Sequence, residues 1–290
     1  MKILATLSGL MAIVMWGAFA LLTQHIKAIP PYILLSICFF LAGLLLPIFR
    51  LITTKPVLAK PTFSWQGCLI SMGCLLFFHV FYFLALDYAP VIQVSLISYL
   101  WPMLLALLVA GSGKRLQALI GGAIGLLAVS LVLGWQHLSL SSTHVWGYLF
   151  ALGCALTWAG YSFYLSTANN SIDDMPWLCF GVALIAFIIS VLTESWQFSI
   201  DGELLIAIVL LTAGPVGGAF YCWEYGLKRG NANFIASLSF SAPLISSLLL
   251  ASFGYAQWSS DLALALGLLI VASVIINYKK RDVQSAAITE

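Results

Sequence analysis

The sequence predicts an all-α integral membrane protein with ten transmembrane helices, arranged as two inverted five-helix repeats. Hydrophobic residues make up 62% of the chain and charged residues 8%, whereas a soluble domain contains about 25% charged residues. Ten apolar runs are each long enough to cross a bilayer, which takes about 20 residues. Stretches in the second half of the chain also align with stretches in the first half. Composition, run length and internal repetition therefore indicate the same fold class.

The apolar runs follow one another with short polar connections, which leaves little chain for a separate soluble domain. The first run is too long for the core of a signal peptide and lacks a small-residue cleavage site, so it counts as a span. The runs must be helices because backbone groups in lipid need internal partners, and a β-barrel would show short alternating segments. The predicted spans are 3–23, 31–52, 65–87, 90–111, 115–134, 145–167, 176–195, 203–227, 232–254 and 260–278.

The positions of the basic residues predict the orientation of these spans. If the N-terminus is cytoplasmic, eleven of the twelve Lys and Arg residues fall on the cytoplasmic side, and only Lys27 falls on the other. Basic residues in short loops are retained in the cytoplasm, so both termini are expected there, with the chain in a bacterial inner membrane. The eleven residues are Lys2, Arg50, Lys55, Lys60, Lys114, Arg115, Lys228, Arg229, Lys279, Lys280 and Arg281.

Internal repetition divides the chain into two halves. Ser98–Pro102 aligns with Ser239–Pro243, and Trp16 aligns with Trp158 after one inserted residue. Five spans return the chain to the opposite face, so a second copy of five must be inverted. We expect a first repeat over residues 1–138 and a second over 139–290, together forming one membrane domain. Inverted repeats are typical of secondary transporters, whose substrate sites lie near the midplane where the repeats meet.

Two prolines occupy equivalent positions near the middle of their spans. Pro102 and Pro243 cannot donate a hydrogen bond to the carbonyl four residues earlier. A carbonyl freed in this way must face protein, water or ligand. The two prolines are therefore predicted as helix hinges that line a polar centre, and the alternative of kinks that serve only packing is equally compatible with the sequence.

Small residues and cysteines favour packing roles. Gly121-x-x-x-Gly125 and Gly214-x-x-x-Gly218 are predicted to let helices approach closely within one protomer, with self-association of two protomers as the alternative. The six cysteines lie inside spans without metal-ligand spacing, so they are expected to be buried thiols rather than disulfides or ligands. No metal or cofactor is expected.

Ionisable residues are scarce inside the spans. His79 lies well inside the third span, where an ionisable residue is a functional candidate for hydrogen bonding or proton handling. The alternative is a neutral core histidine bonded to a carbonyl or hydroxyl. Glu224 precedes Lys228 by four residues near the end of its span, so an i,i+4 pair at the interface is favoured over a carboxylate at a cavity mouth.

Aromatic residues with polar tips gather at the same depth. Such side chains combine a flat apolar face with one hydrogen-bonding group, which suits a neutral or zwitterionic substrate with an aromatic or apolar side chain. A phosphate or sulfate substrate would call for Arg or Lys inside the spans, and the sequence has none there. The predicted substrate-binding residues, in which the last two face the others from the second repeat, are His79, Tyr82, Tyr99, Trp101, Trp158 and Tyr161.

This pattern resembles the drug/metabolite transporter superfamily over nearly the whole chain. Tyr99-Leu100-Trp101-Pro102 is similar to the Tyr-Leu-Trp-Pro signature of its bacterial aromatic amino acid exporters, which are EamA-type members. The resemblance implies export of aromatic or other hydrophobic amino acids and related metabolites across the inner membrane by alternating access. It also implies a central cavity built from both halves. The second copy departs from the signature, with Phe240-Ser241-Ala242 before Pro243, so symmetric substrate contact is not expected.

Other classes of protein fit the sequence less well. A broad-specificity drug or cation exporter would favour a carboxylate deep in a span, and Glu224 is the only candidate. A passive membrane facilitator is also compatible with the sequence. An integral membrane enzyme would need clustered His and carboxylates, but three of the four His lie in loops. The expected partners are a small-molecule substrate and the lipid bilayer, without nucleic acid. Energy coupling and oligomeric state stay undetermined, and a monomer is compatible with the sequence.

Overall fold

The computed structural model describes residues 2–22, 26, 29–53, 56–111, 113–134, 141–169, 171–199, 201–255 and 257–278. Within these ranges, ten helical segments are long and apolar enough to cross a membrane. The fold class predicted from the sequence is therefore confirmed, and the chain is a multi-pass membrane protein. Lys27, Lys55, the tail bases at 279–281, and the proposed repeat boundary at 138/139 lie outside the described residues.

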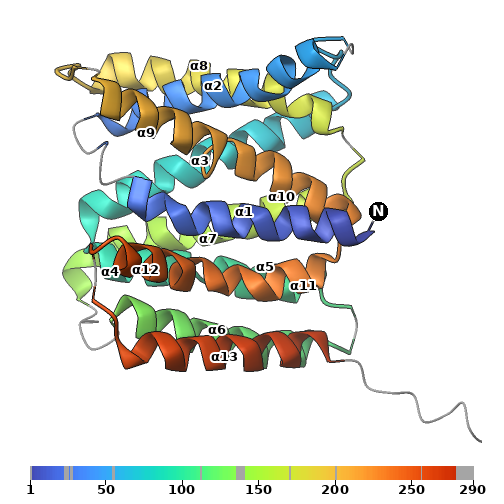
Figure 1. The fold of residues 1–290 in the computed structure, drawn as a ribbon, viewed down its shortest axis with the longest axis vertical. Coiled ribbons are helices and arrows are strands. Elements are labelled where there is room, and N and C mark those ends of the chain that lie inside the picture. Colours follow the sequence, from blue (N-terminus) through green and yellow to red (C-terminus); the bar gives the residue numbers. More distant parts are fainter. Residues whose placement is uncertain are drawn as a thin grey trace, which may run out of the picture.

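Seven spans are formed mainly by one continuous helix, and all helices run side by side across the bundle (Figure 1). Short 3-10 turns, η3 (Ser142–His144) and η4 (Ile172–Asp174), precede two of them. The continuous helices are α1 (Lys2–Leu22), α2 (Pro31–Ile52), α3 (Trp65–Tyr88), α6 (Arg115–Leu133), α7 (Val145–Thr167), α8 (Met175–Thr193) and α13 (Ser260–Asn277).

The other three spans are broken near their middle. The fourth consists of α4 (Val91–Ser98) and α5 (Trp101–Val109), and the ninth of α11 (Ala232–Leu238), η5 (Ser239–Ser241) and α12 (Ala242–Ser252). Pro102 and Pro243 are the second residues of α5 and α12. Proline is tolerated in the first helical turn because the N–H it lacks would have no partner there. Each proline therefore starts a new half-helix, at matching places in the two repeats.

The eighth span breaks between α9 (Gly202–Ala213) and α10 (Gly218–Arg229), which corrects the packing role predicted for Gly214 and Gly218. A Cβ atom at Gly218 would lie 2.0 Å from the carbonyl oxygen of Ala213. At Gly217 it would lie 2.1 Å from the carbonyl oxygen of Thr212. These glycines are needed mainly because the backbone folds tightly on itself here, although a Cβ at Gly217 would also lie 2.9 Å from the Cβ of Ala42 on α2.

The other small-residue pair packs as predicted. A Cβ at Gly121 would lie 2.5 Å from a side-chain carbon of Ile276 on α13, and one at Gly125 would lie 2.8 Å from the ring of Phe240. Both glycines face other helices of the same protomer. The close approach of α6 to α13 therefore depends on Gly121, and its close approach to η5 depends on Gly125, so the predicted packing role of this pair is confirmed.

Helix pairing follows the symmetry expected of inverted repeats. Helix α1 packs against α10 and α12, while its counterpart α7 packs against α3, α4 and α5. Helix α2 pairs with its counterpart α8, and α6 pairs with α13 (Figure 1). The contact between α1 and α10 is close, because a Cβ at Gly226 would lie 2.6 Å from the Cα of Gly9. Two inverted five-helix repeats therefore build one bundle.

Polar contacts fasten α2 to α8 at one end of the bundle. Glu194, which follows α8, accepts hydrogen bonds from the backbone N–H of Tyr32 at 2.7 Å and of Ile33 at 2.9 Å. These N–H groups open α2 and have no partner within the helix. Ser190 donates to the same carboxylate at 2.6 Å. The carboxylate thus caps α2 from a different helix and joins the two repeats.

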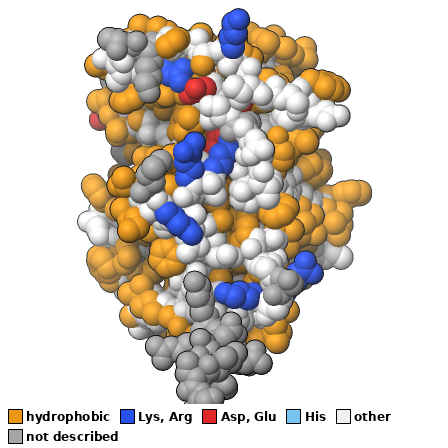
Figure 2. Space-filling view, turned by 90° about the vertical axis from the view of Figure 1, so that its right-hand side faces the viewer, with side chains coloured by type: hydrophobic (Ala, Val, Ile, Leu, Met, Phe, Trp, Pro, Cys, Tyr) orange, Lys and Arg blue, Asp and Glu red, His pale blue; other side chains and the backbone are white. Residues whose placement is uncertain are grey.

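Basic side chains gather at the other end of the bundle, beside the N-terminus (Figure 1). Figure 2 looks onto this end and shows Lys and Arg spread over it. We call this end the basic face, and the described bases at the helix ends and connections there are Lys2, Arg50, Lys60, Lys114, Arg115, Lys228 and Arg229. The described basic residues that the sequence places on one side of the membrane thus lie at one end of the folded bundle. Its placement in the cytoplasm stays a prediction.

Candidate functional site

A central cavity of about 360 Å³ lies between helices of both repeats. Its walls come from α1, α2 and α3, from the broken spans, and from α7. The lining begins at tryptophan residues near the middle of the bundle and extends to Ile26 and Ile29, which precede α2, and to Pro31, its first residue. The start of α2 lies at the end opposite the basic face (Figure 1). The volume falls within the range typical of small-molecule sites.

The cavity brings together five of the six residues predicted to bind substrate. Tyr161 is the exception, since it is 1% exposed and lies outside the lining. Its ring packs behind Trp158, with centroids 5.8 Å apart. This placement corrects the expectation that Tyr161 faces the cavity. The five lining residues are His79, Tyr82, Tyr99, Trp101 and Trp158, and their contact with substrate stays a prediction.

Four tryptophan rings meet at the inner end of the cavity. Trp16 lies at their centre, with its ring centroid 4.9 Å from Trp223, 5.5 Å from Trp158 and 6.1 Å from Trp101. Most of the pairs are edge-to-face, an arrangement that aromatic quadrupoles favour. The rings of Trp16, Trp101 and Trp158 line the cavity, and Trp223 is fully buried behind them. We call these four residues the tryptophan cluster.

Hydrogen bonds fix two members of this cluster. The indole N–H of Trp16 donates to the carbonyl of Pro215 at 3.1 Å, in the break of the eighth span. The indole N–H of Trp223 donates to the hydroxyl of Ser162 on α7 at 3.0 Å. These bonds hold the two rings against the broken backbone of the eighth span and against the continuous helix α7. The cluster is therefore a rigid floor for the cavity.

The lining offers a few polar groups of defined character. His79 Nδ1 lies 2.7 Å from the carbonyl oxygen of Leu75, so Nδ1 carries a proton and donates it. In the neutral ring, Nε2 is then an acceptor. It has no hydrogen-bond partner among the described residues, and the same holds for the indole N–H groups of Trp101 and Trp158. The bond to Leu75 satisfies only one nitrogen of His79, so a ligand can still reach the other.

No charged side chain belongs to the cavity lining within the described part of the chain. Phe39, Phe78 and Phe220 surround the imidazole of His79, with centroid distances of 5.4, 5.1 and 6.4 Å. A ligand here meets aromatic faces, one imidazole acceptor and a few N–H or hydroxyl groups. This chemistry suits an aromatic solute with no net charge.

Sequence reasoning missed some lining residues. The repeat alignment of Trp16 with Trp158 was a usable signal for Trp16, because equivalent residues of inverted repeats meet near their common axis. Phe220 had no such signal. Its position depends on the break of the eighth span, which places the first turn of α10 beside the cavity.

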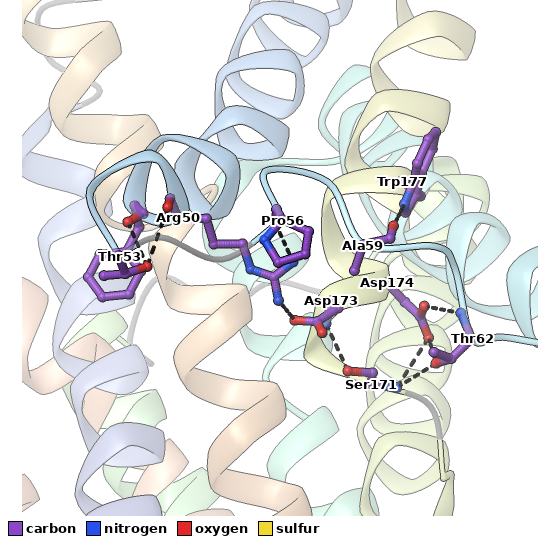
Figure 3. Close-up of polar contacts among 10 residues, drawn as sticks. Arg50, Thr53, Pro56, Ala59, Thr62, Ser171, Asp173, Asp174 and Trp177 are labelled. Atoms are coloured by element: carbon purple, nitrogen blue, oxygen red, sulfur yellow. Dashed lines mark hydrogen bonds and ion pairs between the residues drawn. The ribbon is translucent and has the colours of Figure 1, made fainter.

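Polar contacts join helix connections at the basic face (Figure 3). Asp174 is fully buried and accepts hydrogen bonds from the backbone N–H of Thr62 at 2.6 Å and from its hydroxyl at 2.7 Å. Arg50 forms an ion pair with Asp173, and the indole N–H of Trp177 donates to the carbonyl of Ala59 at 3.0 Å. These contacts tie the connection between α2 and α3 to the connection between α7 and α8. We call this group of residues the basic-face clasp.

A second ion pair lies beneath the basic face. Glu224 and Lys228, one turn apart on α10, are paired, which confirms the predicted i,i+4 interaction. The pair is more buried than an exposed interfacial pair would be, because the Glu224 side chain is 1% exposed and that of Lys228 is 15% exposed, and its depth in the membrane stays a prediction. The pair follows Trp223 along α10 and lies outside the cavity lining.

The sequence and the fold of the chain were compared with those of known proteins. The chain matches the EamA-like transporter family over residues 3–134 and 145–278. It is 34% identical to the aromatic amino acid exporter YddG of Ancylobacter novellus over 280 residues, which cover 93% of this chain and 96% of that protein. It is 27% identical to the YddG exporter of Salmonella typhimurium, with 92% and 96% of the two chains covered. A crystal structure 31% identical in sequence superposes with a TM-score of 0.87 over 96% of this chain and 97% of the other.

Proposed function

The chain belongs to the EamA-like transporter family, and we propose that it exports aromatic amino acids and related amphipathic metabolites across a bacterial inner membrane by alternating access. Membership confirms the resemblance to drug/metabolite transporters that the ten spans, the inverted halves and the mid-span prolines indicated. The two relatives at 34% and 27% identity are named as aromatic amino acid exporters, which supports the same substrate class here.

The observation that carries the proposal is an uncharged cavity floored by the rings of Trp16, Trp101 and Trp158. An aromatic side chain resting on such rings gains about 0.5–1.5 kcal/mol per ring contact beyond the burial of its area. A small side chain such as that of alanine gains none of this. The floor therefore selects aromatic over small aliphatic solutes.

The direction of transport follows from the two ends of the bundle. We place the basic face in the cytoplasm because basic loops are retained there. The cavity lining then extends toward the periplasm, and the basic-face clasp closes the cytoplasmic side. Export requires a second conformation in which the clasp opens and the cavity is reached from the cytoplasm. The half-helices at the three broken spans give the bundle places at which to bend.

Two other transport functions are weaker candidates. A broad-specificity exporter of cationic drugs would be favoured by a carboxylate in the lining, and the lining residues described include none. A passive facilitator would equilibrate its substrate without responding to an ion gradient. Both alternatives give measurably different results in the assay below.

The test is transport by the purified protein in proteoliposomes. Labelled tryptophan, phenylalanine and tyrosine should move faster than alanine, serine, lysine or glutamate, and faster than in protein-free vesicles. Transport of a quaternary ammonium dye with no transport of aromatic amino acids would contradict the proposal. Imposed pH and ion gradients would separate a coupled carrier from a facilitator. Alkaline phosphatase fusions, active after Ser141 and inactive after Ser112, would test the orientation.

A further inference from the structure

We propose that Glu224 and Lys228 form a binding site for the zwitterionic head group of the amino acid on the basic-face side of the tryptophan cluster. When the basic face opens, the Glu224 carboxylate binds the substrate α-ammonium and the Lys228 ammonium binds its α-carboxylate. In the conformation observed, the two side chains neutralise one another. The inference rests on the proposed function and deepens it, because it names how the head group is recognised.

The position of the pair along α10 is the first argument. Phe220 lines the cavity, and Trp223 closes its floor one turn later. Glu224 follows directly, and Lys228 lies one turn nearer the basic face, where α10 ends at Arg229. A solute that approaches the cavity from the basic face along α10 therefore passes these two charges before it reaches the rings.

Burial is the second argument. Charges removed from water are costly, and a buried pair is tolerated only when each charge has a good partner. Removing one partner leaves the other charge uncompensated, which is strongly unfavourable. A zwitterion provides a new partner for Glu224 and for Lys228 in one binding event. When the Glu224–Lys228 pair is replaced by one pair between Glu224 and the substrate ammonium and one between Lys228 and the substrate carboxylate, every buried charge therefore keeps a partner.

A buried hydroxyl on the neighbouring helix α7 is the third argument. The Tyr161 hydroxyl is buried and has no hydrogen-bond partner among the described residues. Helix α7 packs against α10, which carries Glu224, and the Tyr161 ring packs against Trp158 of the cavity floor. A buried hydroxyl without a partner is unfavourable in a single closed structure. A substrate head group at Glu224 gives this hydroxyl a partner.

The described carboxylates of the clasp already have partners of their own. Asp173 is paired with Arg50, and the oxygens of Asp174 accept hydrogen bonds from Thr62 and Ser171. Since the cavity lining described holds no charged side chain, Glu224 and Lys228 are the charges at this depth that match a zwitterion.

The test uses tryptophan and two analogues that each lack one charge. Inhibition of labelled tryptophan uptake from the basic face is measured in oriented proteoliposomes with indole-3-propionate, which lacks the ammonium, and with tryptamine, which lacks the carboxylate. In Glu224→Gln, discrimination against indole-3-propionate should fall about tenfold or more, and discrimination against tryptamine should not. Lys228→Met should show the opposite pattern. Lys114→Met, which removes an exposed charge from the same face, should leave both ratios unchanged.

The outcomes separate this inference from the proposed function. If the wild type transports tryptophan and neither variant changes its ratio of inhibition constants, the pair is only structural and the inference is wrong. If a single variant fails to fold, the double variant Glu224→Gln/Lys228→Gln removes both charges together. The double variant should then lose discrimination against both analogues. If its ratios of inhibition constants equal those of the wild type, the inference is wrong. If the wild type transports no aromatic amino acid, the proposed function fails, and the inference fails with it.

Discussion

Replacement of Trp101 by Ala tests the tryptophan cluster as the floor that selects aromatic substrates. Trp101 is 7% exposed, and its ring lies 5.7 Å from Trp223, 6.1 Å from Trp16 and 6.4 Å from Trp158. Trp101 lines the cavity, and its indole N–H has no hydrogen-bond partner among the described residues. The substitution thus removes one ring and one hydrogen-bond donor from the site.

The expected magnitude is the sum of these two losses. An aromatic contact contributes about 0.5–1.5 kcal/mol beyond area burial, and a hydrogen bond contributes about 0.5–1.5 kcal/mol. Loss of both, about 1–3 kcal/mol, raises the KM for tryptophan roughly 5- to 150-fold. Alanine transport should change less, because its methyl group does not reach across the floor. Trp101→Phe keeps a ring and loses only the N–H, so it should lie between the wild type and Trp101→Ala.

The assay is the initial rate of transport per folded molecule in proteoliposomes. Normalisation is needed because truncating a buried tryptophan costs about 3–5 kcal/mol of folding stability. Trp258→Ala is the matched control, since Trp258 is 66% exposed and lies far along the chain from the cluster. Equal losses for tryptophan and alanine would show that Trp101 supports the fold rather than substrate selection. Unchanged kinetics for tryptophan would remove the cluster from the site.

Further predictions concern the other parts of the cavity and its closure. His79→Ala should lower the rate for every substrate at normal protein yield, because it removes the Nε2 acceptor; reduced yield with normal specific transport would make His79 a core residue. Pro102→Ala and Pro243→Ala should lower transport more than yield, because each lets a continuous helix form through the break; normal rates in both would leave the breaks with a packing role only. Asp174→Asn should weaken the basic-face clasp and speed maleimide labelling of the buried Cys179 thiol from the basic face; an unchanged labelling rate would show that the clasp does not control access. Gly217→Ala should sharply reduce the folded yield measured by size-exclusion chromatography, because its Cβ would meet the carbonyl oxygen of Thr212 at 2.1 Å; a yield equal to the wild type would contradict the need for glycine at this break.

The sequence alone determined the fold class, the inverted repeats and the charged end of the bundle. The fold class depends on apolar runs of about 20 residues, because a helix in lipid must be apolar whatever packs beside it. The repeats and the charged end depend on the order of these runs and of the basic residues between them. Pro102 and Pro243 were equally readable, since proline interrupts a helix by its own covalent structure. The residues His79, Tyr99 and Trp101 could be nominated because polar or amphipathic groups at mid-span are rare.

Tertiary structure decided which of these side chains share a cavity. A helix that is apolar on all sides carries no periodic signal for the face it turns to its neighbours. The sequence therefore could not tell that Tyr161 lies behind Trp158, or that Trp16 and Phe220 line the cavity. Nor could it show that Glu224 is buried, since its spacing from Lys228 is the same at a wet surface and in a dry core. Those outcomes depend on how α1, α7 and α10 pack together, and packing between helices distant in sequence is a property of the whole bundle.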